Sequence, residues 1–513
     1  MSNYNNNYLR IYFWRTISII LGFVSLFVVV PFLSSDKVLY GIFSVCTSLT
    51  VFFSYADLGF LSSATKYAAE FYVRKDLQSE IKAIGFAAFM MLMIFLLIDA
   101  VIIYLAYCPE VLIPGLGNCD KNYLIAQKLL LLLVIGCPFV IGQRVLQVIY
   151  LIRVEDYRYQ IITIIGSLIR ISSVFFFFTS SEYDIVGYYA FYQIINCVIV
   201  LYCLLDIRKY GYQIKNFLSF IRFDKKVFND EKNLSFVSFL FMISMMAYNE
   251  FDQIAISNIY GVEVVSLYAI AFSIMTFMRT YSGLIYSPFT SRYNHFVGLK
   301  DFSGLVSFTR TVILTFAPVL IVPLLSFTLY ANEFVESWVG SDYALSASLT
   351  GWMVMSYSVN FITTPISSFM TSLEKNKNIA VCAFFLPFIY WGGIVCLSPF
   401  MEYKSFAIMK FVAPSILAFY YWIVVNQEVK RIGADFIKIN DLLISIVPSI
   451  IIAIILSLLI SPLLRRSHGN VSLIINLCLM SVSVIITLLA TLLFNRSLRS
   501  IVFKNIRVFI LRK

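Results

Sequence analysis

Ten charged residues lie inside stretches of the sequence that are otherwise apolar enough to cross a membrane. A charge at the middle of a bilayer costs at least about 2.5–3.5 kcal/mol, so such residues persist where they face a water-filled cavity or one another. They are therefore the first candidates for chemistry. The basic ones are Lys128, Arg144, Arg170, Arg279, Arg310 and Lys410, and the acidic ones are Asp57, Asp99, Glu250 and Asp252.

Depth within the span separates the basic residues. Arg170 and Arg279 lie near the middle of their predicted spans, one in each half of the chain, which favours a function for both. Arg144 and Arg310 lie about two turns from the inner ends of theirs, where a functional and a structural role are equally open. The two lysines lie about one turn from the outer face, where a long side chain can also snorkel to water.

The four acidic residues are candidates for ion coupling or gating. Asp57 lies near the inner end of its span, where an ion pair or a helix cap explains it equally well. Asp99 lies deep in its span, and Glu250 and Asp252 belong to a polar cluster in another. Loss of water favours the protonated form of a carboxyl group, which would let it carry protons, whereas a neighbouring arginine favours the ionised form. Both alternatives stay open.

The elements that must position these residues are membrane helices. The chain is 60% hydrophobic and 13% charged, whereas soluble domains are roughly 45–50% apolar with about 25% charge. About 20 apolar residues cross a bilayer, and on that scale we predict an all-α integral membrane protein with about fourteen spans. The predicted spans are 11–33, 39–63, 83–107, 123–150, 160–180, 187–206, 234–259, 264–290, 304–330, 344–371, 379–400, 405–425, 442–461 and 473–494.

Loop charges give the orientation. Lys and Arg crowd one set of alternate loops and both termini, while the charges of the opposite loop 331–343 are all acidic. Because basic loops stay in the cytoplasm, both termini are predicted to be cytoplasmic. The first apolar run, Ile11 to Leu33, is too long for a cleavable signal and is interpreted as a span. We therefore expect a multi-pass protein of the bacterial inner membrane.

The longest inner loop divides the chain near its middle. The motif Lys75-Asp76-Leu77 in the first half is echoed by Lys300-Asp301-Phe302 in the second. This echo favours two lobes of six spans related by a repeat, a common transporter plan, with coincidence as the alternative. The predicted organisation is an N-lobe over 1–206, a cytoplasmic linker over 207–233, a C-lobe over 234–425, two further spans within 426–494 and a basic cytoplasmic tail over 495–513.

Several motifs of other functions are missing. No GxxxxGK[ST] loop for ATP is present, and the two histidines form no metal or catalytic cluster with the cysteines. No soluble stretch is long enough for a catalytic domain, so we expect a transporter that is not an enzyme and has no cofactor or metal. Cys108 and Cys119 share a predicted outer loop, where a disulfide is one possibility. The tail is either an amphipathic segment on the membrane or a disordered basic tail.

Two groups of short motifs carry a family resemblance. In the first half they are Pro31-Phe32-Leu33, Tyr40-Gly41-Ile42, Asp57-Leu58-Gly59-Phe60 and Lys66-Tyr67-Ala68-Ala69-Glu70. In the second group they are Asp252, Gly261-Val262, Tyr268-Ala269-Ile270-Ala271 and Pro288. On these motifs the chain resembles the Wzx-type polysaccharide (O-antigen) flippases of the multidrug/oligosaccharidyl-lipid/polysaccharide (MOP) exporter superfamily.

The resemblance implies transport of undecaprenyl-pyrophosphate-linked oligosaccharide from the inner to the outer leaflet during lipopolysaccharide biosynthesis. It also implies alternating access through a cationic cavity, with a polysaccharide polymerase and a chain-length regulator as possible partners and no nucleic acid. The residues offer a matching physical reason, because guanidinium groups bind phosphate in a bidentate manner. As a hypothesis, Arg144, Arg170, Arg279 and Arg310 line that cavity, and Glu250 and Asp252 couple transport to an ion gradient.

Three other functions compete. A drug or metabolite antiporter of the same superfamily would prefer an acidic cavity, whereas here six basic residues face four acidic ones inside the spans. A polysaccharide polymerase or ligase is expected to carry a large outer loop with arginine and histidine, and the outer loops here are short. A structural envelope protein would leave the charges in both lobes without a reason.

Overall fold

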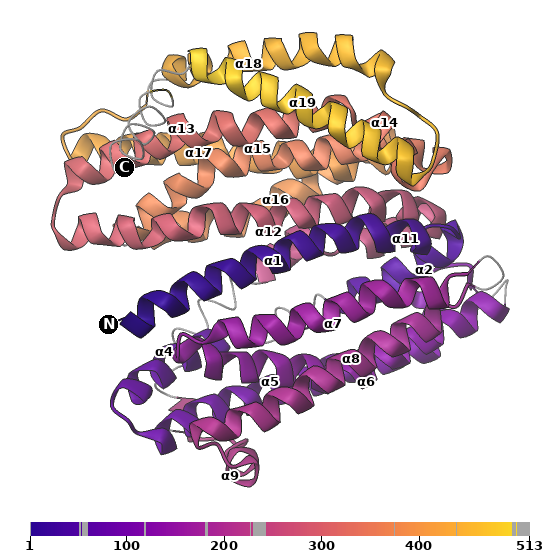
Figure 1. Ribbon diagram of the computed structural model, residues 1–513, viewed down its shortest axis with the longest axis vertical. Helices are drawn as coiled ribbons and strands as arrows, with labels where there is room; N and C mark the ends of the chain where they lie inside the picture. Colours follow the sequence, from indigo (N-terminus) through magenta and orange to yellow (C-terminus); the bar gives the residue numbers. More distant parts are fainter. Residues whose placement is uncertain are drawn as a thin grey trace. The chain divides into compact units, whose positions relative to one another are not determined.

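The computed structural model is all-helical (Figure 1). Across the residues it describes there is no β-strand, only an isolated bridge between Phe178 and Tyr183. Several predictions fall outside those residues: Asp57, Cys119, part of the linker 207–233, the beginning of the span 234–259 and most of the tail 495–513. The described residues are 2–50, 53, 60–116, 120–179, 183–225, 227–228, 243–373, 375–437, 439–494 and 499.

The chain forms two compact units, Met1–Ser266 and Leu267–Lys513. The boundary lies inside one helix, α12 (Val262–Gly298), and so comes later than the loop 207–233 at which we divided the chain from its sequence. The reason is local packing, since α11 (Asp252–Tyr260) contacts α2 (Lys37–Ser48). Gly41 on α2 permits this approach, because a β-carbon there would lie 2.2 Å from the carbonyl oxygen of Val262.

The first unit is a bundle of long helices. Besides α2 and α11 it contains α1 (Ser2–Leu33), α4 (Phe60–Val73), α5 (Leu77–Tyr107), α6 (Asp120–Ile152), α7 (Asp156–Phe177), α8 (Ile185–Asp206) and the short α9 (Ile214–Ser219). α5 packs against α4 and α6, α6 also packs against α8, and α1 packs against α7. This unit holds the cavity described below.

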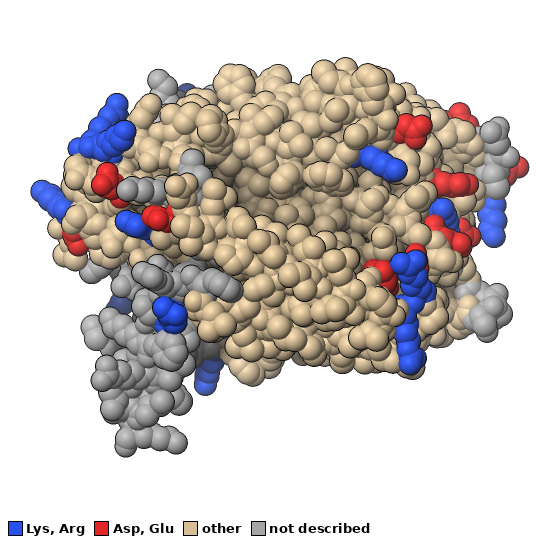
Figure 2. Space-filling model, turned by 90° about the horizontal axis from the view of Figure 1, so that it is seen from above, with Lys and Arg blue, Asp and Glu red and all other residues tan. Residues whose placement is uncertain are grey.

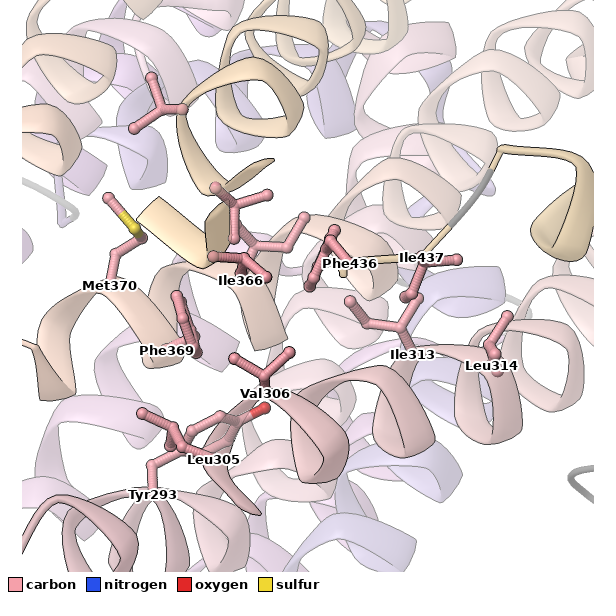
Figure 3. Close-up of a cluster of buried hydrophobic side chains, with 13 residues drawn as sticks. Tyr293, Leu305, Val306, Ile313, Leu314, Ile366, Phe369, Met370, Phe436 and Ile437 are labelled. Carbon is pink, nitrogen blue, oxygen red and sulfur yellow. The ribbon is translucent and has the colours of Figure 1, made fainter. Parts of the chain in front are cut away.

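The second unit is built around one hydroxyl-rich helix. It contains most of α12 together with α13 (Phe302–Leu329), α14 (Ala331–Val339), α15 (Ala344–Ser372), α16 (Asn376–Met401), α17 (Lys404–Arg431), α18 (Ile439–Ile460) and α19 (Asn470–Phe494). α15 packs against both α13 and α17, and the pair α18–α19 packs against α13. Figure 3 shows one of its apolar clusters, in which Phe369 of α15 and Ile313 of α13 are buried together.

Eleven described helices are long and apolar enough to cross a membrane, which confirms the predicted all-α membrane fold but not the count of fourteen. α15 is not among the eleven. Its serines and threonines lower the mean hydropathy, although several of them bond back to their own helix, as Thr350 Oγ1 does to the Ser346 carbonyl at 2.8 Å. On the face drawn in Figure 2, charged side chains gather toward the helix ends and uncharged residues cover the surface between them.

The two Lys-Asp motifs form turns of the same construction. Lys75 and Lys300 have left-handed backbones, with φ of 60° and 57°. The next residue caps the following helix in both cases: Asp76 accepts from the Ser79 backbone N–H at 3.1 Å, and Asp301 accepts from that of Gly304 at 2.8 Å. The repeated Lys-Asp motif therefore forms the same turn and the same helix cap in the two units.

Candidate functional site

A cavity of about 420 Å³ lies within the first unit. Its walls come from α1, α2, α6, α7, α8 and the residues that follow α2. The described lining contains amides, hydroxyls, aromatic rings and one cation, and it includes no carboxylate. It is lined by Leu33, Phe43, Thr47, Thr50, Phe53, Leu133, Gly136, Val140, Gln143, Arg170, Tyr188, Tyr189, Tyr192, Gln193 and Asn196.

Arg170 provides the positive charge of this cavity. Its side chain is half-buried on α7, where Nη2 donates to Ser167 Oγ at 3.0 Å. The guanidinium carbon lies 4.6 Å from the ring centroid of Tyr192 on α8, a cation–π distance. Among the described residues no carboxylate forms an ion pair with Arg170. Its charge is thus held in place by neutral groups and remains available to an anion.

Three amide side chains form a hydrogen-bonded ladder across the α6–α8 contact. Gln143 Nε2 donates to the backbone carbonyl of Asn196 at 3.3 Å and to Asn196 Oδ1 at 3.2 Å. Asn196 Nδ2 in turn donates to Gln193 Oε1 at 3.1 Å. Gln193 and Asn196 are each only 6% exposed, so the hydrogen bonds offset the cost of burying these amides.

Gly136 on α6 makes room for this ladder. A β-carbon at position 136 would lie 2.4 Å from Gln193 Oε1 and 2.7 Å from its Nε2. No side-chain carbon is accommodated at that distance, so glycine is needed for Gln193 to lie flat against α6. The space that the Gln193 amide occupies beside α6 therefore exists because residue 136 has no side chain.

Tyrosines of α8 complete the polar side of the cavity. Tyr189 stacks on Tyr192, with ring centroids 6.0 Å apart, and meets Phe43 of α2 edge-on at 5.7 Å. The buried hydroxyl of Tyr189 lies beside Gln193, yet among the described residues it makes no hydrogen bond of good geometry. A buried hydroxyl without a partner is costly, and Tyr189 is one of the residues that line the cavity.

The other predicted basic residues of the first unit differ in their surroundings. Arg144 is half-buried on α6. Its charge and that of Arg170 both act on the hydroxyl of Tyr159, but Arg144 is not among the described residues that line the cavity. Lys128 is exposed on the surface of α6, as a snorkelling residue would be.

In the second unit, three predicted basic residues have separate environments. Arg279 is half-buried on α12, with Nη2 3.4 Å from Thr276 Oγ1. Arg310 on α13 is exposed and pairs with Asp441 of α18 at 3.3 Å. Lys410 has no exposed surface, and its ammonium lies 4.5 Å from the ring centroid of Tyr390, so it does not snorkel.

The described acidic candidates are withdrawn from the surface. Asp99 is half-buried on α5 beside Cys137 of α6, and its Oδ1 has no hydrogen-bond partner among the described residues. Glu250 is 8% exposed and Asp252, the first residue of α11, is fully buried. Across the described part of the chain no group of three His, Cys, Asp or Glu residues is arranged to hold a metal ion.

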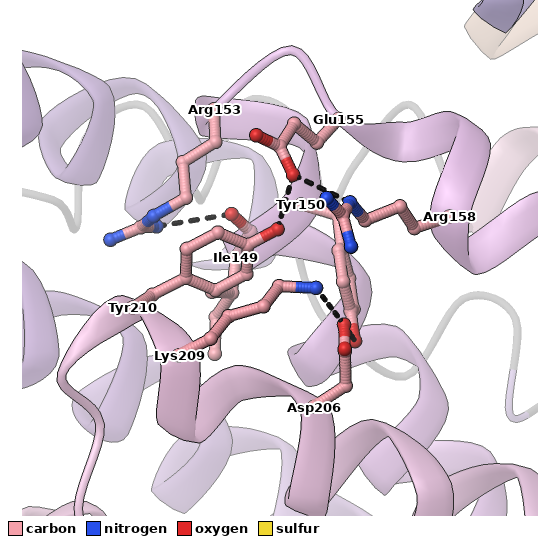
Figure 4. Close-up of polar contacts among 8 residues, drawn as sticks. All are labelled: Ile149, Tyr150, Arg153, Glu155, Arg158, Asp206, Lys209 and Tyr210. Atoms are coloured by element: carbon pink, nitrogen blue, oxygen red, sulfur yellow. Dashed lines mark hydrogen bonds and ion pairs between the residues drawn. The ribbon is translucent and has the colours of Figure 1, made fainter.

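A separate cluster of charges lies where α6 meets α7 (Figure 4). Arg153 is buried and pairs with Glu80 of α5 at 2.6 Å. The rings of Tyr72 and Tyr210 each lie 4.9 Å from its guanidinium carbon. Tyr212 donates to the same carboxylate, and burial first, then the charge of Glu80, raises the pKa of Tyr212 well above its usual value. These contacts fix one end of the bundle and take no part in the cavity lining.

Sequence reasoning found Arg170 but missed the rest of the cavity. Gln143, Gln193, Asn196 and Tyr189 carry no charge, so they do not stand out in an apolar span. One signal was available: Gln193 and Asn196 lie three residues apart and so share a helix face. A pair of amides on one face of a span indicates a polar partner opposite it.

No family model and no curated protein matches this sequence, but solved structures do. The lipid II flippase MurJ in an inward closed conformation matches at a TM-score of 0.71 and 16% identity, over 95% of this chain and 98% of that one. An inward-facing MATE multidrug transporter of the MOP superfamily matches at 0.61 and 14%, over 81% and 96%. A MOP superfamily transporter from Pyrococcus furiosus matches at 0.50 and 13%, over 80% and 94%. The chain thus has the fold of MOP superfamily transporters and is a multi-pass membrane protein.

Proposed function

We propose that this protein is a flippase that moves undecaprenyl-pyrophosphate-linked oligosaccharide, an O-antigen-type repeat unit, from the inner to the outer leaflet of the bacterial inner membrane. The observation that carries the proposal is Arg170, which has no carboxylate partner among the described residues and lies in a cavity whose described lining is otherwise neutral. An uncompensated guanidinium in a membrane protein needs an anion, and pyrophosphate accepts its hydrogen bonds in a bidentate manner.

In this mechanism the first unit holds the charged end of the lipid. Arg170 contacts the pyrophosphate, and we assign a second positive charge to Arg144, which is half-buried on α6. Stacking on Tyr192 keeps the Arg170 fork oriented while the cavity is empty, so little ordering entropy is lost on binding. We assign a similar phosphate contact to Arg279 in the second unit. Arg310, which is exposed and paired with Asp441, is assigned no contact with the substrate.

Coupling to an ion gradient is assigned to Glu250 and Asp252. Both carboxyl groups are buried around the beginning of α11, and a buried carboxyl group changes protonation or binds a cation when its surroundings change. α11 packs on α2, whose residues Phe43 and Thr47 line the cavity. A change of charge at α11 can therefore be transmitted to a cavity wall by direct packing.

The drug or metabolite antiporter of the same fold is the second candidate. Cationic substrates require an anionic site, and the described lining of the cavity offers a cation instead. This difference in charge supports the flippase over the antiporter.

The function is tested with purified protein in proteoliposomes. Undecaprenyl-pyrophosphate-linked oligosaccharide is placed in both leaflets, and a lectin added outside reports the fraction that becomes accessible with time. Wild-type protein should expose nearly all of the lipid, and protein-free vesicles only the outer fraction. Failure to move the lipid, together with proton-driven export of a cationic dye from the same vesicles, would favour the antiporter.

A further inference from the structure

The amide ladder has a fixed direction. The backbone carbonyl of Asn196 can only accept, so the group of Gln143 that faces it must be the NH2 group. Gln143 therefore also donates to Asn196 Oδ1, which turns Asn196 Nδ2 toward Gln193 and makes Gln193 accept through Oε1. Side-chain amides are otherwise ambiguous in orientation, but here one main-chain atom determines all three.

A ladder with this direction leaves a donor at one end and an acceptor at the other. Gln193 keeps its NH2 group, which lies beside the hydroxyl of Tyr189, and Gln143 keeps its Oε1, which has no hydrogen-bond partner among the residues that the structure describes. Both residues line the cavity. The hydroxyl of Tyr189 beside Gln193 adds a group that both donates and accepts.

These groups match the chemistry of a sugar ring. A pyranose presents hydroxyls that donate and accept along its edge and an apolar face that packs on aromatic rings, as Tyr189 and Tyr192 offer. The cavity of about 420 Å³ is within the range of small-molecule sites, so it takes a small part of a glycan. Because Arg170 lines the same cavity, that part is the sugar next to the phosphate.

We infer that Gln143, Asn196 and Gln193, with Tyr189, form a recognition site for the first sugar of the lipid-linked glycan, and that Gly136 sets its specificity by allowing Gln193 to lie against α6. This inference rests on the proposed function and assigns to the same cavity a second task, the choice among glycans. Arg170 binds the pyrophosphate, which all such lipids share, whereas the amide ladder binds the first sugar, which differs between them. A buried amide left without its hydroxyl partner disfavours the wrong sugar.

Two glycines on α6 provide a matched pair of variants. Gly136→Ala pushes its methyl group into the Gln193 amide at 2.4 Å. Gly142→Ala, on the same helix and also facing α8, meets Cγ1 of Val200 at 3.0 Å and does not line the cavity. Gln193→Leu removes the amide without adding bulk at α6. All variants are first compared with wild type by membrane expression and size-exclusion profile.

The experiment measures flipping of two undecaprenyl-pyrophosphate lipids, one with the native first sugar and one with its epimer at a single hydroxyl. Wild type and Gly142→Ala should prefer the native sugar, and Gly136→Ala and Gln193→Leu should lose about tenfold of this preference, the value of one hydrogen bond. An unchanged preference in both variants, or an equal loss in Gly142→Ala, overturns the inference while the flippase stands. Wild-type protein that moves neither lipid overturns the proposed function and the inference with it.

Discussion

The guanidinium of Arg170 on α7 lies 4.6 Å from the ring centroid of Tyr192 on α8. This contact holds a positive charge at the cavity wall without using up its hydrogen bonds to an anion. The phosphate contact that we propose for Arg170 and its ring contact with Tyr192 can therefore be tested separately.

Arg170→Ala should lower the flipping rate about 10- to 100-fold, because a hydrogen bond to a charged group contributes roughly 1.5–3 kcal/mol. Arg170→Lys should restore part of the rate, since one point charge replaces a two-pronged donor. Tyr192→Leu should reduce the rate less than Arg170→Ala, because the charge remains and only its orientation is lost. The control is Lys128→Ala on exposed α6 surface, and a normal rate in Arg170→Ala would contradict the assignment.

Arg310→Ala should leave flipping within about twofold of wild type. The ion pair of Arg310 with Asp441 is exposed, with 45% and 40% of the two side chains accessible, and exposed pairs contribute about 0.2–1 kcal/mol. Complementation of a flippase-null strain measures the outcome, with the exchange variant Arg310→Asp/Asp441→Arg as control. A loss of transport as large as that of Arg170→Ala would show that Arg310 takes part in transport and contradict this prediction.

Arg153→Met should destabilise the protein by about 3–5 kcal/mol, because it leaves the carboxylate of Glu80 buried without its partner. The double variant Arg153→Met/Glu80→Gln should recover much of that loss. Thermal unfolding in detergent is the measurement, and Arg158→Ala, which removes a more exposed pair with Glu155, is the matched control. Equal unfolding temperatures for the two single variants would contradict the role of the buried cluster.

Asp252→Asn should abolish the dependence of flipping on an imposed proton or sodium gradient, because the amide keeps the shape of the fully buried carboxyl group and removes its charge. Downhill exchange of lipid between leaflets should continue. Flipping is measured in proteoliposomes with and without a gradient, which separates gradient-driven transport from downhill exchange. If the variant still responds to the gradient as wild type does, Asp252 is a structural residue.

Lys300→Gly should stabilise the second unit by up to about 1 kcal/mol. Lys300 has a φ of 57°, which costs a residue with a side chain roughly 1–2 kcal/mol and costs glycine little. Part of the gain is offset by the greater freedom of glycine in the unfolded chain. Lys300→Ala keeps the β-carbon and should bring no gain, so equal unfolding temperatures for the two variants would contradict this explanation.

Hydropathy predicted the membrane helices well where a long apolar segment of the sequence forms one helix. The predicted span 187–206 corresponds to α8 (Ile185–Asp206), and 160–180 corresponds to α7 (Asp156–Phe177). The predicted span 344–371 corresponds to α15 (Ala344–Ser372), although α15 is not among the eleven described helices that are long and apolar enough to cross a membrane, and several of its hydroxyls bond back to their own helix. Length and hydropathy carry no information on which helices become neighbours, such as the close approach of Gly41 on α2 to Val262 at the start of α12.

The candidate site could be predicted only in part, and charge explains the difference. Arg170 stands out because its cost in lipid is large. Gln193 and Asn196 cost less, and their partners on α6 are about 50 residues away in sequence, as the separation of 53 between Gln143 and Asn196 illustrates. The place of Arg310 could not be predicted in full, because its exposed partner Asp441 lies 131 residues further along the chain.

The missing side chain at Gly136 also bears on how such transporters diverge. In the recognition site that we infer, a single methyl group at this position would displace one amide, because it would lie 2.4 Å from Gln193 Oε1. Relatives of this protein could thus acquire a new cargo through one codon. Position 136 is accordingly the first place to alter when a host is engineered to export a foreign glycan.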